Sequence, residues 1–271
     1  IVFLGYLSSE KNLYYYYSYI TYEFYKIGDH PIYLTVQFAI AMFFLFFNSA
    51  FKKYQKNILF SILLFGLFFL SRKGVIFSFL ISLVFYLYTI LKLKKEFLLI
   101  FSFLVLCFIA SLFVSEIRGR YIEFFDKSKI TNNEKTSTGI RIILWQNSIE
   151  LINNSPLIGY GIGDTQKLLS TQLEEKGYHK IADKKSNCHN QYLQYLLSIG
   201  VLGFVFFIYS IFSIFSIFYQ QNFILGISIL TFFLMVFLTE SFLDRQNGII
   251  IFYLFISLLV FCLNEIKQEN I

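Results

Sequence analysis

The chain has little charge. Only 15% of its 271 residues are Asp, Glu, Lys or Arg, whereas charged residues make up about 25% of a typical soluble domain. Proline occurs only twice. Hydrophobic residues reach 56%, aromatic residues 21%, and the mean hydropathy is +0.61. This composition excludes an ordinary soluble domain and indicates an integral membrane protein.

Cysteine and histidine are scarce, with three of each. Two cysteines lie inside apolar runs and the third, Cys188, stands alone at a loop end, so the sequence contains neither a disulfide framework nor a CxxC metal pattern. A thiol nucleophile at Cys188 beside His189 is disfavoured, because adjacent residues of a helix point in different directions. No recognised zinc spacing connects His179, Asp183, Cys188 and His189. We therefore expect no metal and no cofactor.

Apolar runs long enough to cross about 30 Å of hydrocarbon recur along the chain. They cover residues 32–51, 57–70, 75–91, 97–115, 192–219, 223–239 and 249–263. They predict an all-α, polytopic transmembrane bundle of about seven spans. We expect an interfacial Tyr-rich segment (1–31), four spans (32–115), a large loop (116–190), three spans (191–264) and a tail (265–271). The first residues read as the end of an earlier span, which predicts N-terminal truncation.

Basic residues in short loops indicate the orientation, because Lys and Arg near span ends stay on the cytoplasmic side. Two such clusters occur, at residues 52–56 and 92–95. Counting spans from them places four segments on the outer face: the N-terminal segment, the turn at 71–74, the loop 116–190 and the loop 240–248. The tail at 265–271 falls inside the cell.

The turn between the second and third spans carries Arg72 and Lys73. A cation at or near the membrane usually has a partner, and the neighbouring sequence offers no acid. We expect an anionic ligand there, such as a lipid pyrophosphate. The alternative is that both side chains extend to the outer lipid headgroups.

The predicted outer loop contains Arg118, Arg120 and Arg141. Apolar residues at helical spacings across residues 139–154 predict an amphipathic helix lying against the bundle. Arg141 falls in its first turn, and a guanidinium group can hold a phosphate with two hydrogen bonds. A solvated loop arginine remains the alternative. The following glycines, at 159, 161 and 163, predict a compact turn, because no preceding strand supports a nucleotide-binding loop.

Four motifs then occur in a fixed order: Ser-Arg at 71–72, T-G-x-R-x-x-x-W at 138–145, P-L-x-G-x-G-x-G at 156–163, and H-N-x-Y-L-x-x-L-x-x-x-G at 189–200. Together they resemble the O-antigen ligase and polymerase family of bacterial envelope glycosyltransferases, from about residue 30 to the C-terminus. The chain departs from the family pattern at Lys73, where a small residue is common.

This resemblance implies metal-independent, inverting transfer of a glycan from undecaprenyl pyrophosphate to a hydroxyl on the outer, periplasmic face of the bacterial inner membrane. The acceptor would be a lipid A core sugar, for a ligase, or another glycan or carrier; nucleic acid is not an expected partner. His189 resembles the catalytic histidine, and Arg72 and Arg141 resemble the pyrophosphate-binding arginines. Further candidates are Lys73, Arg118, Arg120, Asn190, Glu240 and Arg245.

Three alternatives stay open on the sequence. His189 stands near a helix start, where a histidine is often a cap. Glu240, Asp244 and Arg245 either shape the acceptor site or pair with one another. A transporter, a lipid flippase or a non-catalytic scaffold is the rival function, although the interiors of the predicted spans lack the ionisable residues that transport usually needs.

Overall fold

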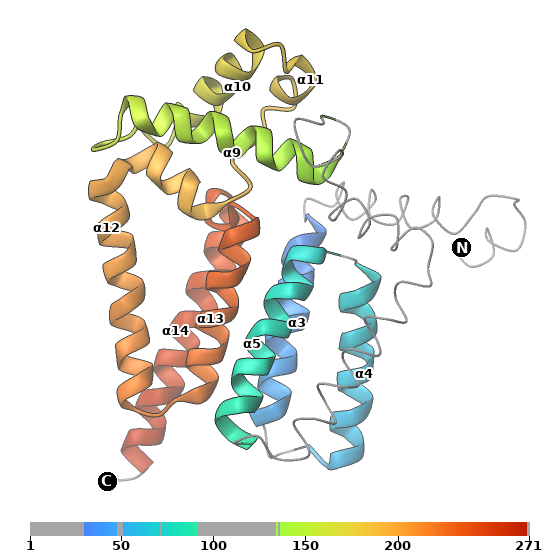
Figure 1. The fold of residues 1–271 in the computed structure, drawn as a ribbon. Coiled ribbons are helices and arrows are strands. Elements are labelled where there is room, and N and C mark those ends of the chain that lie inside the picture. The colour runs from blue at the N-terminus through green and yellow to red at the C-terminus, as the bar shows by residue number, and fades with distance from the viewer. Residues whose placement is uncertain (1–29, 48–50, 71, 92–133, 135, 270–271) are drawn as a thin grey trace, which may run out of the picture.

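The structure is a computed structural model that describes residues 30–47, 51–70, 72–91, 134 and 136–269. All regular elements in these ranges are helices (Figure 1). They are α3 (Pro31–Phe47), α4 (Lys53–Phe69), α5 (Lys73–Leu91), α9 (Ser137–Asn154), α10 (Thr165–Glu175), α11 (His179–Ala182), α12 (Gln191–Gln220), α13 (Ile224–Thr239), the 3-10 turn η1 (Phe242–Asp244) and α14 (Gln246–Glu269).

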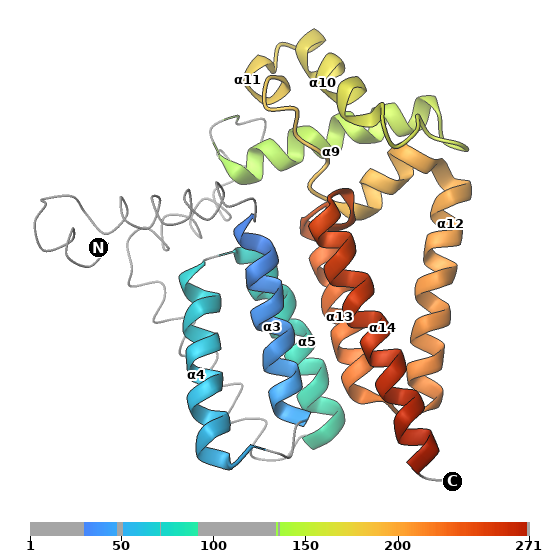
Figure 2. The ribbon, with the colours of Figure 1, turned by 180° about the vertical axis from the view of Figure 1, so that it is seen from behind.

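Among the described residues, the long helices α3, α4, α5, α12, α13 and α14 form the bundle. Helix α9 lies across one end of it, with α10 and α11 beyond (Figures 1 and 2). The all-α expectation is confirmed for the described residues. Six of the seven predicted apolar runs coincide with α3, α4, α5, α12, α13 and α14, and the run 97–115 lies outside the described residues. By length and composition, α12 and Gln246–Leu263 suffice to cross a membrane, whereas α3, α5 and α13 are apolar but shorter. The number of seven spans stays a prediction.

Helix α13 is the interior helix of the bundle. It packs against α5, α12, α3 and α14, and all residues from 225 to 230 are buried. Aromatic rings fill the space around it; Phe233 meets Phe252 of α14 edge to face with ring centroids 5.0 Å apart. A helix that is apolar all round must be covered on every side. The C-terminal end of α13 is thereby held firmly against its neighbours.

A second, smaller core lies under α9, α10 and α11. It joins Ile143 and Leu144 of α9 to Leu169 and Leu173 of α10, and it also includes Leu197 of α12. The predicted amphipathic helix, α9, therefore packs its apolar side chains against both α12 of the bundle and the α10–α11 pair. Its N-cap is Thr136, whose Oγ1 accepts a hydrogen bond from the Gly139 N–H at 3.0 Å.

Helix α12 is broken at Gly200, which has φ 62° and ψ −173°. The first segment lies along the end of the bundle, and the second runs down it (Figure 1). The break leaves two carbonyls, of Leu197 and Ser198, and two N–H groups, of Val201 and Leu202, without their helical partners. The loop 155–163 pairs with all four.

These pairings resemble a short two-stranded ladder. The loop donates from Tyr160 N–H to the Leu197 carbonyl at 3.0 Å and from Gly161 N–H to the Ser198 carbonyl at 2.8 Å. In return its carbonyls at positions 156 and 157 accept from the N–H groups of residues 201 and 202 at 2.8 and 3.2 Å. The glycine-rich turn is thus architecture that closes the α12 break.

Glycine is required where the two backbones meet. A Cβ on Gly200 would lie 2.3 Å from the Leu157 carbonyl oxygen, and one on Gly159, with φ 68°, would lie 2.7 Å from the Gly200 nitrogen. Both positions also have a backbone conformation that L-residues rarely adopt. Gly159 of the third sequence motif and Gly200 of the fourth therefore form one joint between the loop and α12.

We expect Gly200→Ala to destabilise the protein by about 2 kcal/mol or more, because it adds a steric overlap to a conformation that costs about 1–3 kcal/mol for a non-glycine residue. Thermal unfolding of purified protein in detergent measures the effect. Gly163→Ala is the matched control, since its added Cβ meets nothing within 4 Å. Equal unfolding temperatures for the two variants would show that the joint tolerates a side chain.

Candidate functional site

A histidine, a carboxylate and an arginine from three separate elements meet at the end of the bundle beneath α9. His189 lies in the loop before α12, Glu240 follows α13, and Arg141 lies at the end of the first turn of α9. The Glu240 Oε1 accepts from Arg141 Nη2 at 2.6 Å, and its Oε2 lies 3.1 Å from His189 Nδ1. The three side chains are 28%, 21% and 36% exposed for Arg141, Glu240 and His189, so each is anchored and still accessible.

The surroundings of Glu240 determine the charge of its carboxyl group. Burial by itself raises the pKa of the carboxyl group, but the hydrogen bond with His189 and the positive charge of Arg141 outweigh it, so the pKa is lowered overall. The carboxylate is therefore ionised at neutral pH and accepts the Nδ1–H of the imidazole. A neutral imidazole in that tautomer presents an unprotonated Nε2, which is the atom that a general base uses.

The backbone of His189 is held in an uncommon conformation. Its φ is 48°, in the left-handed region that non-glycine residues seldom occupy. Hydrogen bonds hold the peptide group that precedes it: the His189 N–H donates to Asn187 Oδ1 at 3.2 Å, and the Cys188 carbonyl accepts from Trp145 Nε1 at 2.9 Å. The next peptide is also held, because the Asn190 N–H donates to Ser241 Oγ at 3.1 Å. Such over-determined strain is typical of functional positions.

The helix cap is Asn190, not His189. The Asn190 Oδ1 accepts from the N–H groups of Tyr192 and Leu193 at 3.0 and 3.1 Å. Its Nδ2 donates to the Leu238 carbonyl at 3.2 Å, and its own N–H donates to Ser241 Oγ at 3.1 Å. The capping alternative for the histidine is therefore wrong, and the imidazole is left for another role.

Two glutamines, Gln191 and Gln194, join the start of α12 to the loop after α13. The Gln191 Oε1 accepts from the Leu243 N–H at 2.6 Å, and the Gln194 Nε2 donates to Asp244 Oδ1 at 3.1 Å. The other oxygen of Asp244 accepts from Asn187 Nδ2 at 3.0 Å. Asp244 and Glu240 thus bind other partners instead of pairing with Arg245. The sequence signal for this contact is two amide side chains three residues apart at the start of an apolar run, and both are buried in the structure.

A second histidine, His30, belongs to the same cluster and was missed by the sequence analysis. Burial, together with the positive charges of Arg72 and Arg245, lowers its pKa to about 4, and Glu240 and His189 also act on it electrostatically. His30 is therefore neutral at physiological pH. Its signal in the sequence is a His-Pro pair directly before an apolar run, a pattern that also fits an ordinary helix start.

The remaining candidates are placed as follows. Arg72 lies between α4 and α5, and its Nε is buried with no hydrogen-bond partner among the residues described. Lys73 is exposed at the first position of α5. Arg118 and Arg120 lie outside the described residues. Within the described ranges, no group of three or more His, Cys, Asp or Glu side chains is arranged to hold a metal ion.

Cys188 is a structural residue. Its thiol is buried and lies 3.1 Å from the Ser148 hydroxyl. Burial raises the pKa of the thiol to about 12, so it stays protonated and is a poor nucleophile. This environment disfavours a thiol mechanism, as the sequence does.

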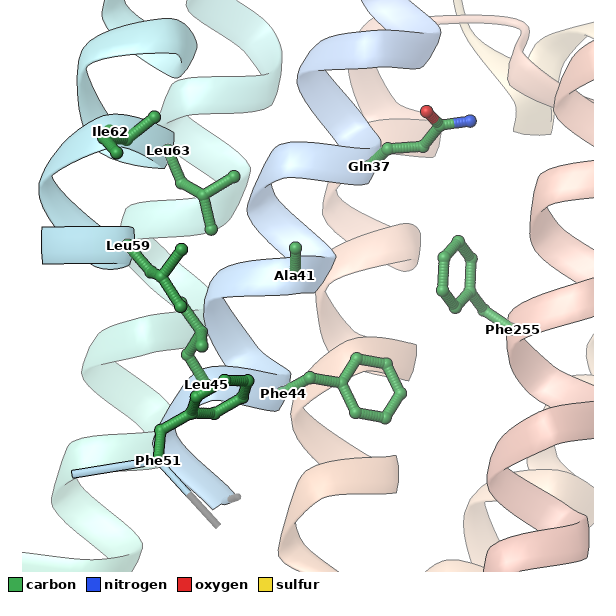
Figure 3. Close-up of a pocket in the computed structure, with 9 residues that line it drawn as sticks. All are labelled: Gln37, Ala41, Phe44, Leu45, Phe51, Leu59, Ile62, Leu63 and Phe255. Carbon is green, nitrogen blue, oxygen red and sulfur yellow. The ribbon is translucent and has the colours of Figure 1, made fainter. Parts of the chain in front are cut away.

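An apolar groove lies between α3, α4 and α14, away from the polar cluster (Figure 3). Its volume is about 370 Å³. Phe44, Leu63 and Phe255 line it together with one polar side chain, Gln37, and none of the cluster residues contributes. The groove and the polar cluster are therefore separate features, and the cluster lies at the end of the bundle for which the sequence predicts an outer surface.

An apolar helical bundle with a histidine–carboxylate–arginine cluster at one end is consistent with a membrane protein that carries a polar site at its surface. The particular family follows from comparison: the chain belongs to the O-antigen ligase family, whose sequence profile matches residues 58–208, more than half of its 271 residues. The resemblance drawn from the four motifs is confirmed. The matched part contains Arg72, Arg141 and His189, whereas His30 and Glu240 lie outside it. No curated protein matches the chain.

Membership in this family indicates a glycosyl-transferring enzyme of the bacterial inner membrane, with a role in lipopolysaccharide or polysaccharide biosynthesis. Its substrates are accordingly lipid-associated glycans.

We expect Glu240→Gln to lower glycan transfer by on the order of 10²-fold or more, because the amide keeps the shape but removes the charge that fixes the imidazole tautomer. The measurement is transfer per unit of inserted protein. Glu174→Gln, at an exposed position of α10, is the matched control. Transfer by Glu240→Gln at the control rate would contradict a role for the carboxylate.

Proposed function

We propose that the protein transfers a glycan from an undecaprenyl-pyrophosphate donor to an acceptor hydroxyl on the outer face of the bacterial inner membrane. The observation that carries the proposal is the contact between His189 Nδ1 and the ionised Glu240, 3.1 Å apart. It leaves Nε2 free to take a proton from a hydroxyl group. Family membership supports the reaction class, and the contact with Glu240 supports His189 as the base.

The reaction is a single displacement. As Nε2 of His189 accepts the acceptor's proton, the hydroxyl oxygen attacks the anomeric carbon and the bond from that carbon to the pyrophosphate oxygen breaks. The configuration at the anomeric carbon inverts. The lipid pyrophosphate leaves with the negative charge that develops on it, and the imidazolium is stabilised by the Glu240 carboxylate.

The guanidinium groups of Arg72 and Arg141 stabilise the leaving group. Only one Arg141 nitrogen, Nη2, is bonded to Glu240, and a guanidinium group has five N–H donors, so Arg141 can hold the base assembly and a phosphate oxygen together. Arg72 contributes a buried Nε–H that has no partner among the described residues. The neutral His30 imidazole beside it adds a hydrogen-bonding group without adding charge.

The distribution of polar groups favours surface chemistry over transport. The cluster lies at one end of the bundle, and the described parts of α12 and α13 contain no Asp, Glu, Lys, Arg or His. A transporter usually needs ionisable groups near the membrane midplane. The acceptor is a lipid A core sugar for a ligase, or another lipid-linked glycan for a polymerase. The glycan ladder of cells lacking the gene distinguishes the two: long chains left on the carrier indicate a ligase, and single repeats indicate a polymerase.

Replacing His189 tests the base directly. We expect His189→Asn and His189→Ala to lose on the order of 10²- to 10⁴-fold of the transfer rate, while donor binding is retained because the arginines hold the pyrophosphate. Purified protein in lipid with a defined undecaprenyl-pyrophosphate donor provides both measurements. His179→Asn, at an exposed histidine of α11, is the matched control and should keep full activity. Near wild-type transfer by His189→Asn would remove the base from the mechanism.

A further inference from the structure

The loop 155–163 exposes three large aliphatic side chains. Leu157, Ile158 and Ile162 are 63%, 72% and 73% exposed. Tyr160, between them in the sequence, is turned inward and donates from its hydroxyl to the Leu151 carbonyl at 3.0 Å. In this loop the aromatic ring therefore points toward the protein, and the aliphatic side chains point away from it. A cluster of exposed aliphatic side chains marks an interaction site.

The loop is also rigid at its base. Backbone hydrogen bonds in both directions fasten it to the break in α12, and Ser155 Oγ closes it by donating to the Gly159 carbonyl at 3.0 Å. The Leu157 carbonyl accepts from the Leu202 N–H. These hydrogen bonds thus fix the position of the loop, and with it the aliphatic side chains, beside the first residues of the second segment of α12.

That segment continues the same apolar surface. After the break, α12 has about 20 residues, or about 30 Å of helix, which is the thickness of the hydrocarbon core. Its outward side chains include Leu202, Val205 and Phe206, which are 57%, 58% and 74% exposed. On a membrane-crossing helix such side chains face lipid, and the loop extends this surface past the point where α12 bends away.

We propose that the loop 155–163 inserts Leu157, Ile158 and Ile162 into the outer leaflet of the bilayer, at the boundary between headgroups and acyl chains. Insertion there fixes the depth of the site, because the first segment of α12 connects the loop joint at Gly200 to His189. The partner is lipid, argued from the continuity of the loop with the lipid-facing side of α12. The choice of the outer leaflet rests on the orientation in the proposed function, whereas insertion itself does not rest on the glycosyl-transfer mechanism.

Depth-dependent quenching tests the insertion. A fluorescent NBD group is attached at Ile158→Cys, with the native cysteines replaced by serine, and the protein is reconstituted in phosphatidylcholine–phosphatidylglycerol vesicles. Thr171→Cys, at an exposed position of α10, is the control site, and Ile162→Cys is a second test site. We expect nitroxide lipids labelled at the headgroup or the upper acyl chain to quench residues 158 and 162 several-fold more than residue 171, with aqueous iodide giving the opposite order.

Two results would overturn the proposal. Equal iodide quenching at residues 158 and 171 would place the loop in water. Shielding of residue 158 from both iodide and nitroxide lipids would show that protein covers the loop, either another segment of this chain or a partner. Neither result affects the His189 mechanism, which is measured separately.

Discussion

The carboxylate of Glu240 is the interaction on which the site depends. It binds a residue 99 positions away, Arg141, and another 51 positions away, His189, and so joins the starts of α9 and α12 to the end of α13. A partly buried carboxylate is tolerated when its charge is compensated, and here both oxygens have cationic or hydrogen-bonding partners. Because α13 is the interior helix, its end gives this charge a fixed position.

The rest of the local structure holds His189 against that charge. Asn190 caps α12, Gln191 and Gln194 fasten the helix to the loop after α13, and the break at Gly200 turns the helix into the bundle. Within the motif at residues 189–200, Asn190 and Gly200 therefore have structural roles. The side chain of His189 is not needed to cap the helix. Arg72 and His30 complete the cluster from the other half of the bundle.

Much of the fold was predictable because membrane helices carry a strong signal. Long apolar runs located α3, α12 and α13 to within a few residues, and helical spacing located α9. The order of four short motifs was sufficient to predict the family. Arg141 and His189 were identified as site residues through that resemblance, and the structure brings them together.

The parts that failed depend on contacts between distant segments. Nothing near Glu240 in the sequence shows that it binds Arg141 and His189 instead of Arg245. His30 precedes α3 by one residue, and only the packing of α3 in the bundle brings it to Arg72 and Glu240. The break at Gly200 could not be predicted, because a glycine inside an apolar run is tolerated in a membrane helix. The break forms because a loop about 40 residues earlier pairs with the backbone there.

A double-mutant cycle on transfer rate tests the central claim, that Glu240 acts through His189. The rates of wild type, His189→Asn, Glu240→Gln and the double variant are compared in the same reconstituted system. If the two residues act as a unit, the double variant loses no more than His189→Asn alone, because the carboxylate has no imidazole left to orient. Losses that multiply, so that the two free-energy changes add, would show that Glu240 acts independently and would contradict the account.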